Sequence, residues 1–293
     1  MENKIIWLAS YPKSGNTWFR SFLTALQNDG EIDINTMQTD GIFSDKGYVE
    51  TVLDLSVDDL SPREFENYRK LAFIYKAKES TKDSFVKIHD AYTYSRWDGL
   101  PLIPSEGSRL ALYFVRNPLD VVLSLANHIG LTVDETIDQY MNCEDGAFIK
   151  KNRIAQQYRQ LLGTWAMHAS SWIDQNNIPV HVIRYEDMKE NPLDTFKEAT
   201  LQMQLNYDDK TIHKAIESCD FNKLKAQEVN RGFKERPNAA SAFFFKGESG
   251  RWKKELTNQQ IKNIMTINES MMKRFGYWEE AINQIDNNGK QKI

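Results

Sequence analysis

The sequence predicts a single α/β domain in which helices cover both faces of a central parallel β-sheet. Short apolar runs rich in β-branched or aromatic residues alternate with stretches that carry helix start signals, and this alternation implies parallel strand pairing through crossovers. No internal repeat or Gly/Ser-rich linker divides the 293 residues, of which 41% are apolar and 12% aromatic. Residues 1–280 are therefore expected to form the domain, and residues 281–293 a polar C-terminal tail.

The predicted strands are short, apolar and rich in Val, Ile, Leu and Phe, as buried parallel strands are. In chain order they are Lys4–Ser10, Ser84–Ile88, Arg109–Val115 and Val180–Arg184. Ligands of such sheets bind at the carboxyl ends of the strands. Residues that directly follow a strand are therefore the first candidates for a functional site.

The predicted helices begin at recognisable capping sequences. A Ser or Thr followed three residues later by Glu or Gln forms a capping box, and proline is favoured at the first helical position. These signals occur at Ser61-Pro62 with Glu64, at Asn117-Pro118, at Thr132 with Glu135, and at Thr257 with Gln260.

Composition excludes several classes of protein. The 37 basic and 41 acidic residues give a net charge of −4, so no general positive field of the kind that nucleic-acid binders use is expected. Cys143 and Cys219 lie far apart without CxxC spacing, which argues against a disulfide scaffold or a structural zinc site. Neither a signal peptide nor an apolar run of about 20 residues is evident. We therefore expect a cytoplasmic location.

The first predicted strand runs into a phosphate-binding loop, Ser10-Tyr-Pro-Lys-Ser-Gly-Asn-Thr17, and then into a helical stretch. The loop fits the frame G-x-x-x-x-G-K-[ST], with Gly15 and Thr17 in their expected places. Its backbone amides at a helix N-terminus would favour an anion. Asn16 replaces the usual lysine, Lys13 stands three residues earlier, and no magnesium-binding acid is evident. The sequence thus predicts an anion site without the triphosphate machinery. We expect this strand–loop–helix unit at the edge of the sheet.

The stretch Tyr11–Trp18, YPKSGNTW, resembles the 5′-phosphosulfate loop of cytosolic-type sulfotransferases, which usually reads YPKSGTTW. Four further segments are similar to motifs of that family in the expected order, so the resemblance spans roughly residues 4 to 278. They are Val86–His89, Tyr113–Ser124, Arg184–Pro192 and Lys246–Lys253. The resemblance implies sulfuryl transfer from 3′-phosphoadenylyl sulfate (PAPS) to a hydroxyl or amine, with 3′-phosphoadenosine 5′-phosphate (PAP) as product and no metal.

The resemblance also implies roles for individual residues. His89 is the expected general base, and its ordinary pKa of ~6.5 suits proton transfer near neutral pH. Lys13 is expected to stabilise charge on the bridging oxygen, and Lys87 to act on the sulfuryl oxygens. Residues Ser14, Gly15, Asn16 and Thr17 would hold the 5′-phosphate, Arg116 and Ser124 the 3′-phosphate, and Trp18, Tyr185 and Phe221 the adenine.

Three positions depart from the family pattern. Phe245 replaces an arginine that helps to hold the 3′-phosphate, Arg251 replaces an aspartate, and Asn16 replaces a threonine. We therefore expect the 3′-phosphate to depend more on Arg116 and Ser124, with backbone amides near Lys246 and Gly247 as helpers.

The acceptor is not identified by the sequence, and a small molecule, a peptide side chain and a sugar all remain open, as does the oligomeric state. Two segments match no motif, Asp29–Lys82 and Asn230–Phe245, and we expect them to choose the acceptor. The second contains Gly232 and Pro237 and is predicted to be a mobile lid. His128 could line the acceptor pocket or have a structural role.

Two other functions would require residues different from those of sulfuryl transfer. An ATP-dependent kinase would need a lysine in place of Asn16 and a magnesium-binding acid. A non-catalytic nucleotide-binding protein would need neither His89 nor Lys13.

Overall fold

The computed structural model describes residues 4–37, 39–149 and 157–290, and it confirms the predicted α/β fold. Within these residues, four parallel strands form the main sheet in the order β2-β1-β3-β6. The strands are β1 (Ile5–Ser10), β2 (Ser84–Ile88), β3 (Ser108–Val115) and β6 (Val180–Arg184). Each predicted strand is thus confirmed, with boundaries that differ by one residue at most.

The position of β1 corrects one expectation. The strand that carries the phosphate loop is not at the edge of the sheet, because it pairs with β2 on one side and with β3 on the other. All six of its residues are buried, as a strand covered on both faces requires. The strand order reverses between β1 and β3, and ligands of open α/β sheets bind at such a point.

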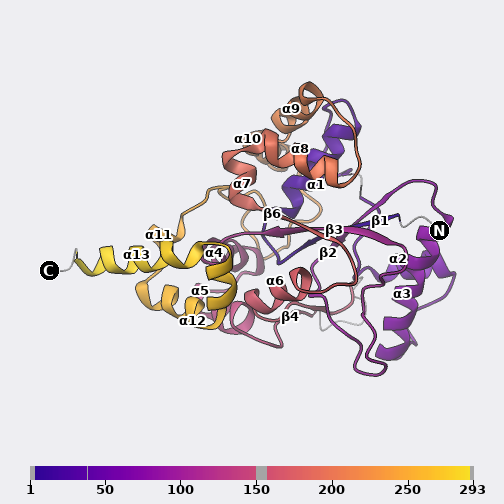
Figure 1. Ribbon diagram of the computed structural model, residues 1–293, viewed down its shortest axis with the longest axis horizontal. Helices are drawn as coiled ribbons and strands as arrows, with labels where there is room; N and C mark the ends of the chain where they lie inside the picture. The colour runs from indigo at the N-terminus through magenta and orange to yellow at the C-terminus, as the bar shows by residue number, and fades with distance from the viewer. Residues whose placement is uncertain (1–3, 38, 150–156, 291–293) are drawn as a thin grey trace.

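Helices cover both faces of the sheet, as predicted (Figure 1). They are α1 (Asn16–Gln27), α2 (Lys46–Leu53), α3 (Pro62–Glu79), α4 (Pro118–Ile129), α5 (Val133–Thr136), the π-helix Ile137–Met141, α6 (Trp165–Ile173), α7 (Tyr185–Glu190), α8 (Pro192–Gln202), α9 (Asp209–Ser218), α10 (Phe221–Arg231), α11 (Trp252–Glu255), α12 (Asn258–Arg274) and α13 (Tyr277–Lys290). A small antiparallel pair joins β4 (Ala147–Phe148) and β5 (Gln160–Leu161).

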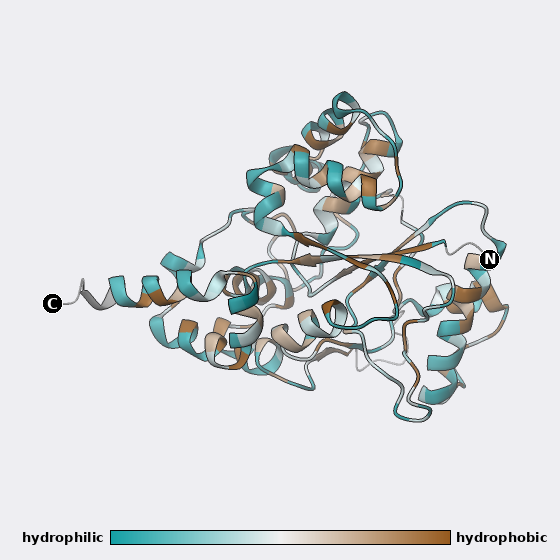
Figure 2. Ribbon diagram, in the orientation of Figure 1, coloured by the Kyte–Doolittle hydropathy of each residue, from teal (hydrophilic) through white to brown (hydrophobic). Residues whose placement is uncertain are grey.

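The alternation of side chains along β1 divides the core into two layers. Ile6 and Leu8 pack with the apolar faces of α1, α8 and α9, whereas Ile5 and Trp7 pack with those of α4, α6 and α12. Figure 1 accordingly shows α1, α8 and α9 on one side of the sheet and α4, α6 and α12 on the other. In Figure 2 the strands between these layers are mostly brown, whereas much of the surrounding helices is teal.

The predicted helix starts are confirmed by capping hydrogen bonds. Ser61, Thr132 and Thr257 each form a complete capping box, and the side chain of Asn117 accepts a hydrogen bond from the amide of Leu119 at the start of α4. The boundary predicted between residues 280 and 281 falls inside α13, where Ala281 is fully buried. Residues 291–293 of the predicted tail lie outside the described residues.

We expect the Leu112→Ala substitution to lower the free energy of unfolding by about 2–5 kcal/mol, because Leu112 is fully buried in β3 and its loss leaves a cavity. Urea denaturation measures this effect. Leu71→Ala on α3 is the matched control, since Leu71 is 51% exposed and its loss should change stability by no more than about 0.5 kcal/mol. Equal effects of the two substitutions would contradict the two-layer core.

Candidate active site

A cavity of about 1400 Å³ lies where the strands of the main sheet end, and it brings most of the predicted site residues together. Lys13 follows β1, His89 follows β2, Arg116 follows β3 and Tyr185 follows β6. The other predicted residues on its wall are Gly15, Asn16, Thr17, Trp18, Lys87, Ser124, Phe221, Lys246 and Gly247. Ser14 alone of the predicted set does not line the cavity, and its side chain is fully buried.

The phosphate loop depends on left-handed backbone at two positions. Lys13 has φ 72° and Gly15 has φ 106°, and glycine adopts such values at little cost. A Cβ atom at Gly15 would lie 2.7 Å from Cε of Met188 and 2.9 Å from Cδ2 of Tyr185, so a larger residue does not fit. Gly15 caps α1 without a side-chain hydrogen bond. The first amides of α1 have no partner within the helix, and the helix dipole favours an anion there.

The side chain of Asn16 connects the phosphate loop to β1 by hydrogen bonds. Its Nδ2 donates to the carbonyl of Leu8 at 2.8 Å and to Oγ of Ser10 at 3.2 Å, and the residue is only 3% exposed. The side chain that replaces the nucleotide-binding lysine is therefore turned back toward β1. Any contact of Asn16 with a ligand would be made by its backbone amide.

Arg116 connects the phosphate loop to the segment between α10 and α11. Its guanidinium group donates to the carbonyls of Lys13 at 3.3 Å and Glu248 at 2.8 Å, and it lies 4.2 Å from the ring centre of Tyr185. Nε of Arg116 is buried without a hydrogen-bond partner. The carboxylate of Asp120 accepts from the amides of Gly250 and Trp252, which fixes the same segment to α4.

Two of the three aromatic residues predicted to hold an adenine, Trp18 and Phe221, line the cavity from different helices. Trp18 on α1 makes edge contacts with Tyr185 and Phe196, at centroid distances of 5.9 and 5.5 Å. Phe221 begins α10 and lies against Gly247, where a Cβ atom would approach its ring to 2.4 Å. Gly247 is therefore needed for the approach of this backbone to Phe221.

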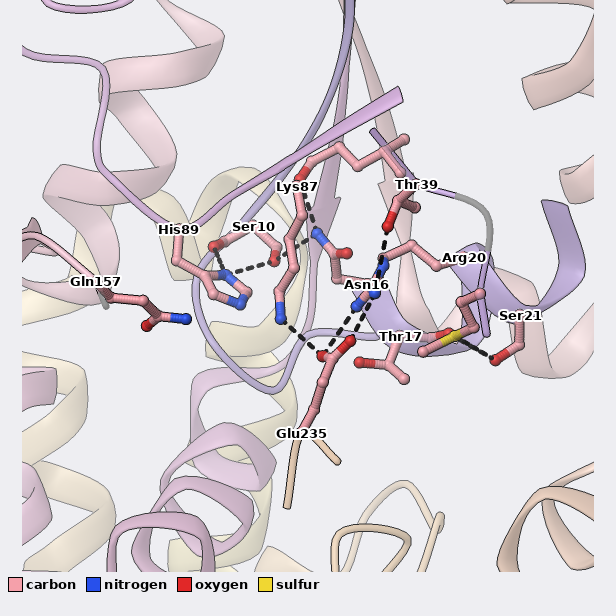
Figure 3. A network of polar contacts seen from close by, with 12 residues as sticks. Ser10, Asn16, Thr17, Arg20, Ser21, Thr39, Lys87, His89, Gln157 and Glu235 are labelled. Carbon is pink, nitrogen blue, oxygen red and sulfur yellow. Dashed lines mark hydrogen bonds and ion pairs between the residues drawn. The ribbon is translucent and has the colours of Figure 1, made fainter. Parts of the chain in front are cut away.

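His89 is held in the tautomer that a general base requires (Figure 3). Its Nδ1 lies 2.9 Å from the carbonyl of Ser10 and 3.2 Å from Oγ of the same residue. A carbonyl can only accept a hydrogen bond, so Nδ1 carries the proton and Nε2 is the free acceptor. Burial, followed by the charge of Lys87, holds the pKa of His89 well below its usual value of 6.5. The imidazole is therefore neutral near pH 7, with Nε2 free of a proton.

A second histidine, His168, fixes the backbone of His89 by a hydrogen bond. Nε2 of His168 donates to the carbonyl of His89 at 3.0 Å, and Nδ1 of His168 accepts from the hydroxyl of Tyr113 at 2.9 Å. Trp172, also on α6, donates to the carbonyl of Asp90 at 2.9 Å. These residues carry no sequence signal of a functional site, because aromatic residues on one helix face are usually core.

Lys13 is the loop lysine that faces the cavity. Its Nζ lies 4.0 Å from the ring centre of Phe243. Burial lowers the pKa of Lys13 to about 7, and the neighbouring charges of Lys87 and Arg116 contribute to the shift. Without a bound anion, the ammonium form of Lys13 is therefore poorly stabilised, and an anionic ligand would stabilise it.

Lys87 is not free in the cavity, because it forms an ion pair with a residue that sequence analysis missed. Its Nζ lies 3.0 Å from Oε2 of Glu235, which also pairs with Arg20 of α1 (Figure 3). Arg20 lies three residues after Thr17 and therefore on the same face of α1. This helical spacing from the loop could have identified Arg20 as a site residue. Glu235 belongs to the motif-free segment Asn230–Phe245, which offers no such signal.

Two further findings concern metals and membranes. Among residues 4–37, 39–149 and 157–290, no group of three or more His, Cys, Asp and Glu side chains is placed to hold a metal ion. No helix in the described part of the chain is long and apolar enough to cross a membrane.

Comparisons with known proteins agree in the family that they find. The profile of the family described as the sulfotransferase domain matches residues 3–276. Cytosolic sulfotransferase 17 of Arabidopsis thaliana is 23% identical over 290 residues, which cover 92% of this chain and 75% of that protein. Flavonol 3-sulfotransferase of Flaveria bidentis is 23% identical over 271 residues, with 88% and 78% covered.

The fold has solved counterparts as well. The crystal structure of mouse sulfotransferase SULT7A1, complexed with PAP, has a TM-score of 0.58 and 18% sequence identity. The match covers 97% of this chain and 89% of that one. At this level of identity the likeness concerns the fold, which is the same arrangement of a parallel sheet between helices.

The buried His168 should make stability depend on pH. Burial lowers the pKa of His168 to about 4, whereas the unfolded chain binds a proton near the ordinary value of 6.5. Between these values the unfolded state binds more protons, so the free energy of unfolding falls as the pH falls, by up to about 1.4 kcal/mol per pH unit from this residue. Urea denaturation at pH 7, 6 and 5 should give a shallower slope for His168→Gln than for the wild type.

The control for this measurement is His213→Asn, since the side chain of His213 is 60% exposed. This variant should keep the wild-type slope. A wild-type slope in His168→Gln would mean that the folded protein protonates His168 as readily as the unfolded chain does.

Proposed function

The chain belongs to the sulfotransferase domain family, and we propose on that premise how its cavity transfers a sulfuryl group from PAPS to an acceptor. The observation that carries the proposal is the convergence of a neutral His89 with Lys13, Lys87 and Arg116 in one cavity beside the N-terminus of α1. This arrangement offers a base for the acceptor and positive charge for the donor.

The donor's 5′-phosphate is proposed to lie at the N-terminus of α1. The backbone amides of residues 14–17 and the hydroxyl of Thr17 are available there, and the left-handed turn at Gly15 supports this arrangement. Ser14 would contribute only its amide, because its side chain is buried away from the cavity. Trp18, Tyr185 and Phe221 all line the cavity and are proposed to contact the adenine, with Trp18 and Phe221 on its two faces.

The 3′-phosphate is proposed to bind at Arg116 and Ser124, both of which line the cavity. Arg116 already donates to two carbonyls, and its remaining N–H groups can serve a phosphate. Phe245 occupies the place of the family's second arginine, and the ammonium group of Lys246 is paired with Glu255 at 3.2 Å. Amides near Lys246 and Gly247 are therefore the proposed additional donors.

The transfer itself is proposed to use His89 as the base. The acceptor hydroxyl or amine gives its proton to Nε2 of His89 while its oxygen or nitrogen forms the new bond to sulfur. The bond between sulfur and the bridging oxygen breaks at the same centre, and PAP departs with that oxygen. Lys13 belongs to the loop that is proposed to hold the 5′-phosphate, so its ammonium form can stabilise the charge on the leaving oxygen.

We propose a small-molecule acceptor, which the name of the relative flavonol 3-sulfotransferase supports, and we propose that two segments select it. Thr39, Gly41, Ile42 and Asp45 of the segment Asp29–Lys82 line the cavity. Residues 234–237 and 243–245 of the segment Asn230–Phe245 line it as well. His128 also faces the cavity, and burial lowers its pKa to about 3, so it is neutral beside the reacting groups.

A cytoplasmic location is the corresponding proposal for the whole protein. It is supported by curated relatives that are named cytosolic sulfotransferases and by the free thiols of Cys143 and Cys219, which suit a reducing compartment. Subcellular fractionation would test it, and recovery of the protein from an oxidising compartment would contradict it.

The His89→Ala substitution should abolish turnover while it leaves nucleotide binding intact. Loss of a general base costs about 100-fold or more in rate, which can be measured with ³⁵S-labelled PAPS and a panel of phenols, alcohols and amines. In a thermal-shift titration, PAP at 100 times its Kd should stabilise wild type and variant alike by about 2.7 kcal/mol.

AMP and ATP–magnesium are the comparison ligands in that titration. Both should stabilise the protein less than PAP does, because neither carries a 3′-phosphate for Arg116. Stabilisation by ATP–magnesium equal to that by PAP would contradict the donor assignment. Joint loss of turnover and PAP binding in His89→Ala would contradict the role of His89 as base.

Exchanging the segments Asp29–Lys82 and Asn230–Phe245 for those of a related sulfotransferase should change the acceptor preference. Relative kcat/KM over the same acceptor panel measures this preference, and the PAP-induced thermal shift verifies that the chimera retains its donor site. An unchanged order of acceptors would contradict the proposed role of the segments.

A further inference from the structure

Glu235 reaches from the segment between α10 and α11 into the cavity and lies between two cations. Its Oε2 accepts from Nζ of Lys87 at 3.0 Å and from Nη1 of Arg20 at 3.0 Å, and its Oε1 accepts from Nη2 of Arg20 at 2.6 Å. Figure 3 shows the carboxylate between the ends of these two side chains. The three groups come from β2, α1 and a loop, so the cluster joins three parts of the fold.

The backbone around Glu235 is fixed at both ends. On one side, Asn35 donates to the carbonyl of Gly232 and accepts from the amide of Lys234. On the other, the buried carboxylate of Glu228 accepts from the amides of Phe243 and Phe244 at 2.7 and 2.9 Å. The backbone on both sides of Glu235 is therefore held by contacts that do not involve Lys87.

Arg20 fixes the orientation of the carboxylate. It holds both oxygens of Glu235 in a two-pronged contact, a geometry that the planar guanidinium group favours. The side chain of Arg20 is 5% exposed, against 15% for Lys87 and 22% for Glu235. Because Arg20 orients the carboxylate of Glu235, this carboxylate in turn positions the flexible side chain of Lys87.

The electrostatic balance shows why Lys87 needs this partner. Burial lowers the pKa of Lys87, Glu235 raises it, and Arg20 lowers it again. Burial alone would raise the pKa of Glu235, yet Lys87 and Arg20 hold that pKa well below its usual range. Without the carboxylate, the ammonium group of Lys87 would have two cations as neighbours, Arg20 and Lys13. His89 and His128 are neutral, and burial in the cavity already disfavours a charge there.

We propose that Glu235 is a positioning residue of the transfer reaction, which holds Lys87 as an ammonium ion directed at the sulfuryl group of the donor. This inference rests on the proposed action of Lys87 on the sulfuryl oxygens. Glu235 leaves two of the three N–H bonds of that ammonium group available for the donor. The carboxylate thus acts through Lys87 and need not touch the donor itself.

The Glu235→Gln substitution tests the inference, since it removes the charge and keeps the shape of the side chain. An opposite charge at this distance shifts a pKa by about 1–3 units. Lys87 should therefore lose its proton at lower pH in the variant, and the alkaline limb of the kcat/KM profile should move to lower pH by about one unit or more. An alkaline limb at the wild-type position would overturn the inference.

Two further variants identify the group that titrates. Arginine stays protonated throughout this pH range, so in the Lys87→Arg background only the weaker effect of Glu235 on Lys13 remains. The Glu235→Gln substitution should therefore move the alkaline limb less in that background than in the presence of Lys87, and equal movements would overturn the inference. Glu190→Gln removes an exposed carboxylate at the end of α7 and should leave the limb in place.

A measurement that needs no turnover is the pH titration of the ¹³Cε resonance of Lys87, assigned by its absence in Lys87→Arg. The titration midpoint should be lower in Glu235→Gln than in the wild type, and equal midpoints would overturn the inference. Lys87→Met separates this outcome from the proposed function. A wild-type kcat in Lys87→Met would exclude a catalytic role of Lys87. A loss of kcat in Lys87→Met, together with an alkaline limb of the kcat/KM profile that Glu235→Gln does not move, would exclude the role of Glu235 alone.

Discussion

The close packing of Tyr185 and Met188 beneath Gly15 determines where the proposed anion site lies. These two residues follow β6, so their contact with Gly15 locks the end of β6 against the loop that follows β1. Arg116, which follows β3, then bridges that loop and stacks on Tyr185. The backbone amides of α1, the guanidinium group and the aromatic wall of the cavity therefore depend on one glycine without a Cβ atom.

The sequence predicted the fold closely because local signals and burial agree along most of the chain. The strands end where apolar runs end, and the capping boxes at Ser61, Thr132 and Thr257 mark helix starts in the structure. The order of strands was harder to predict, because pairing is decided by contacts between distant segments. β1 was expected at an edge, although its apolar residues on both faces are those of an interior strand.

The site was predictable where its residues belong to motifs and unpredictable where they are brought in by loops. Lys13, His89 and Arg116 each follow a strand, and one rule about strand ends locates all three. Glu235 comes from a segment without a motif, and His168 acts through the carbonyl of His89. Neither relation has a sequence spacing that could be recognised, since each depends on tertiary packing. The partners of Lys87 and His89 therefore became visible only in the structure.

The interior position of β1 has an evolutionary consequence. The proposed acceptor base follows β2 and the proposed 3′-phosphate arginine follows β3, so the two halves of the reaction lie on opposite sides of one strand. The segment that leads into β2 can then accumulate substitutions and insertions without disturbing the strand pair that carries the proposed donor site. Gene duplication followed by divergence of that segment would yield enzymes with new acceptors and an inherited donor.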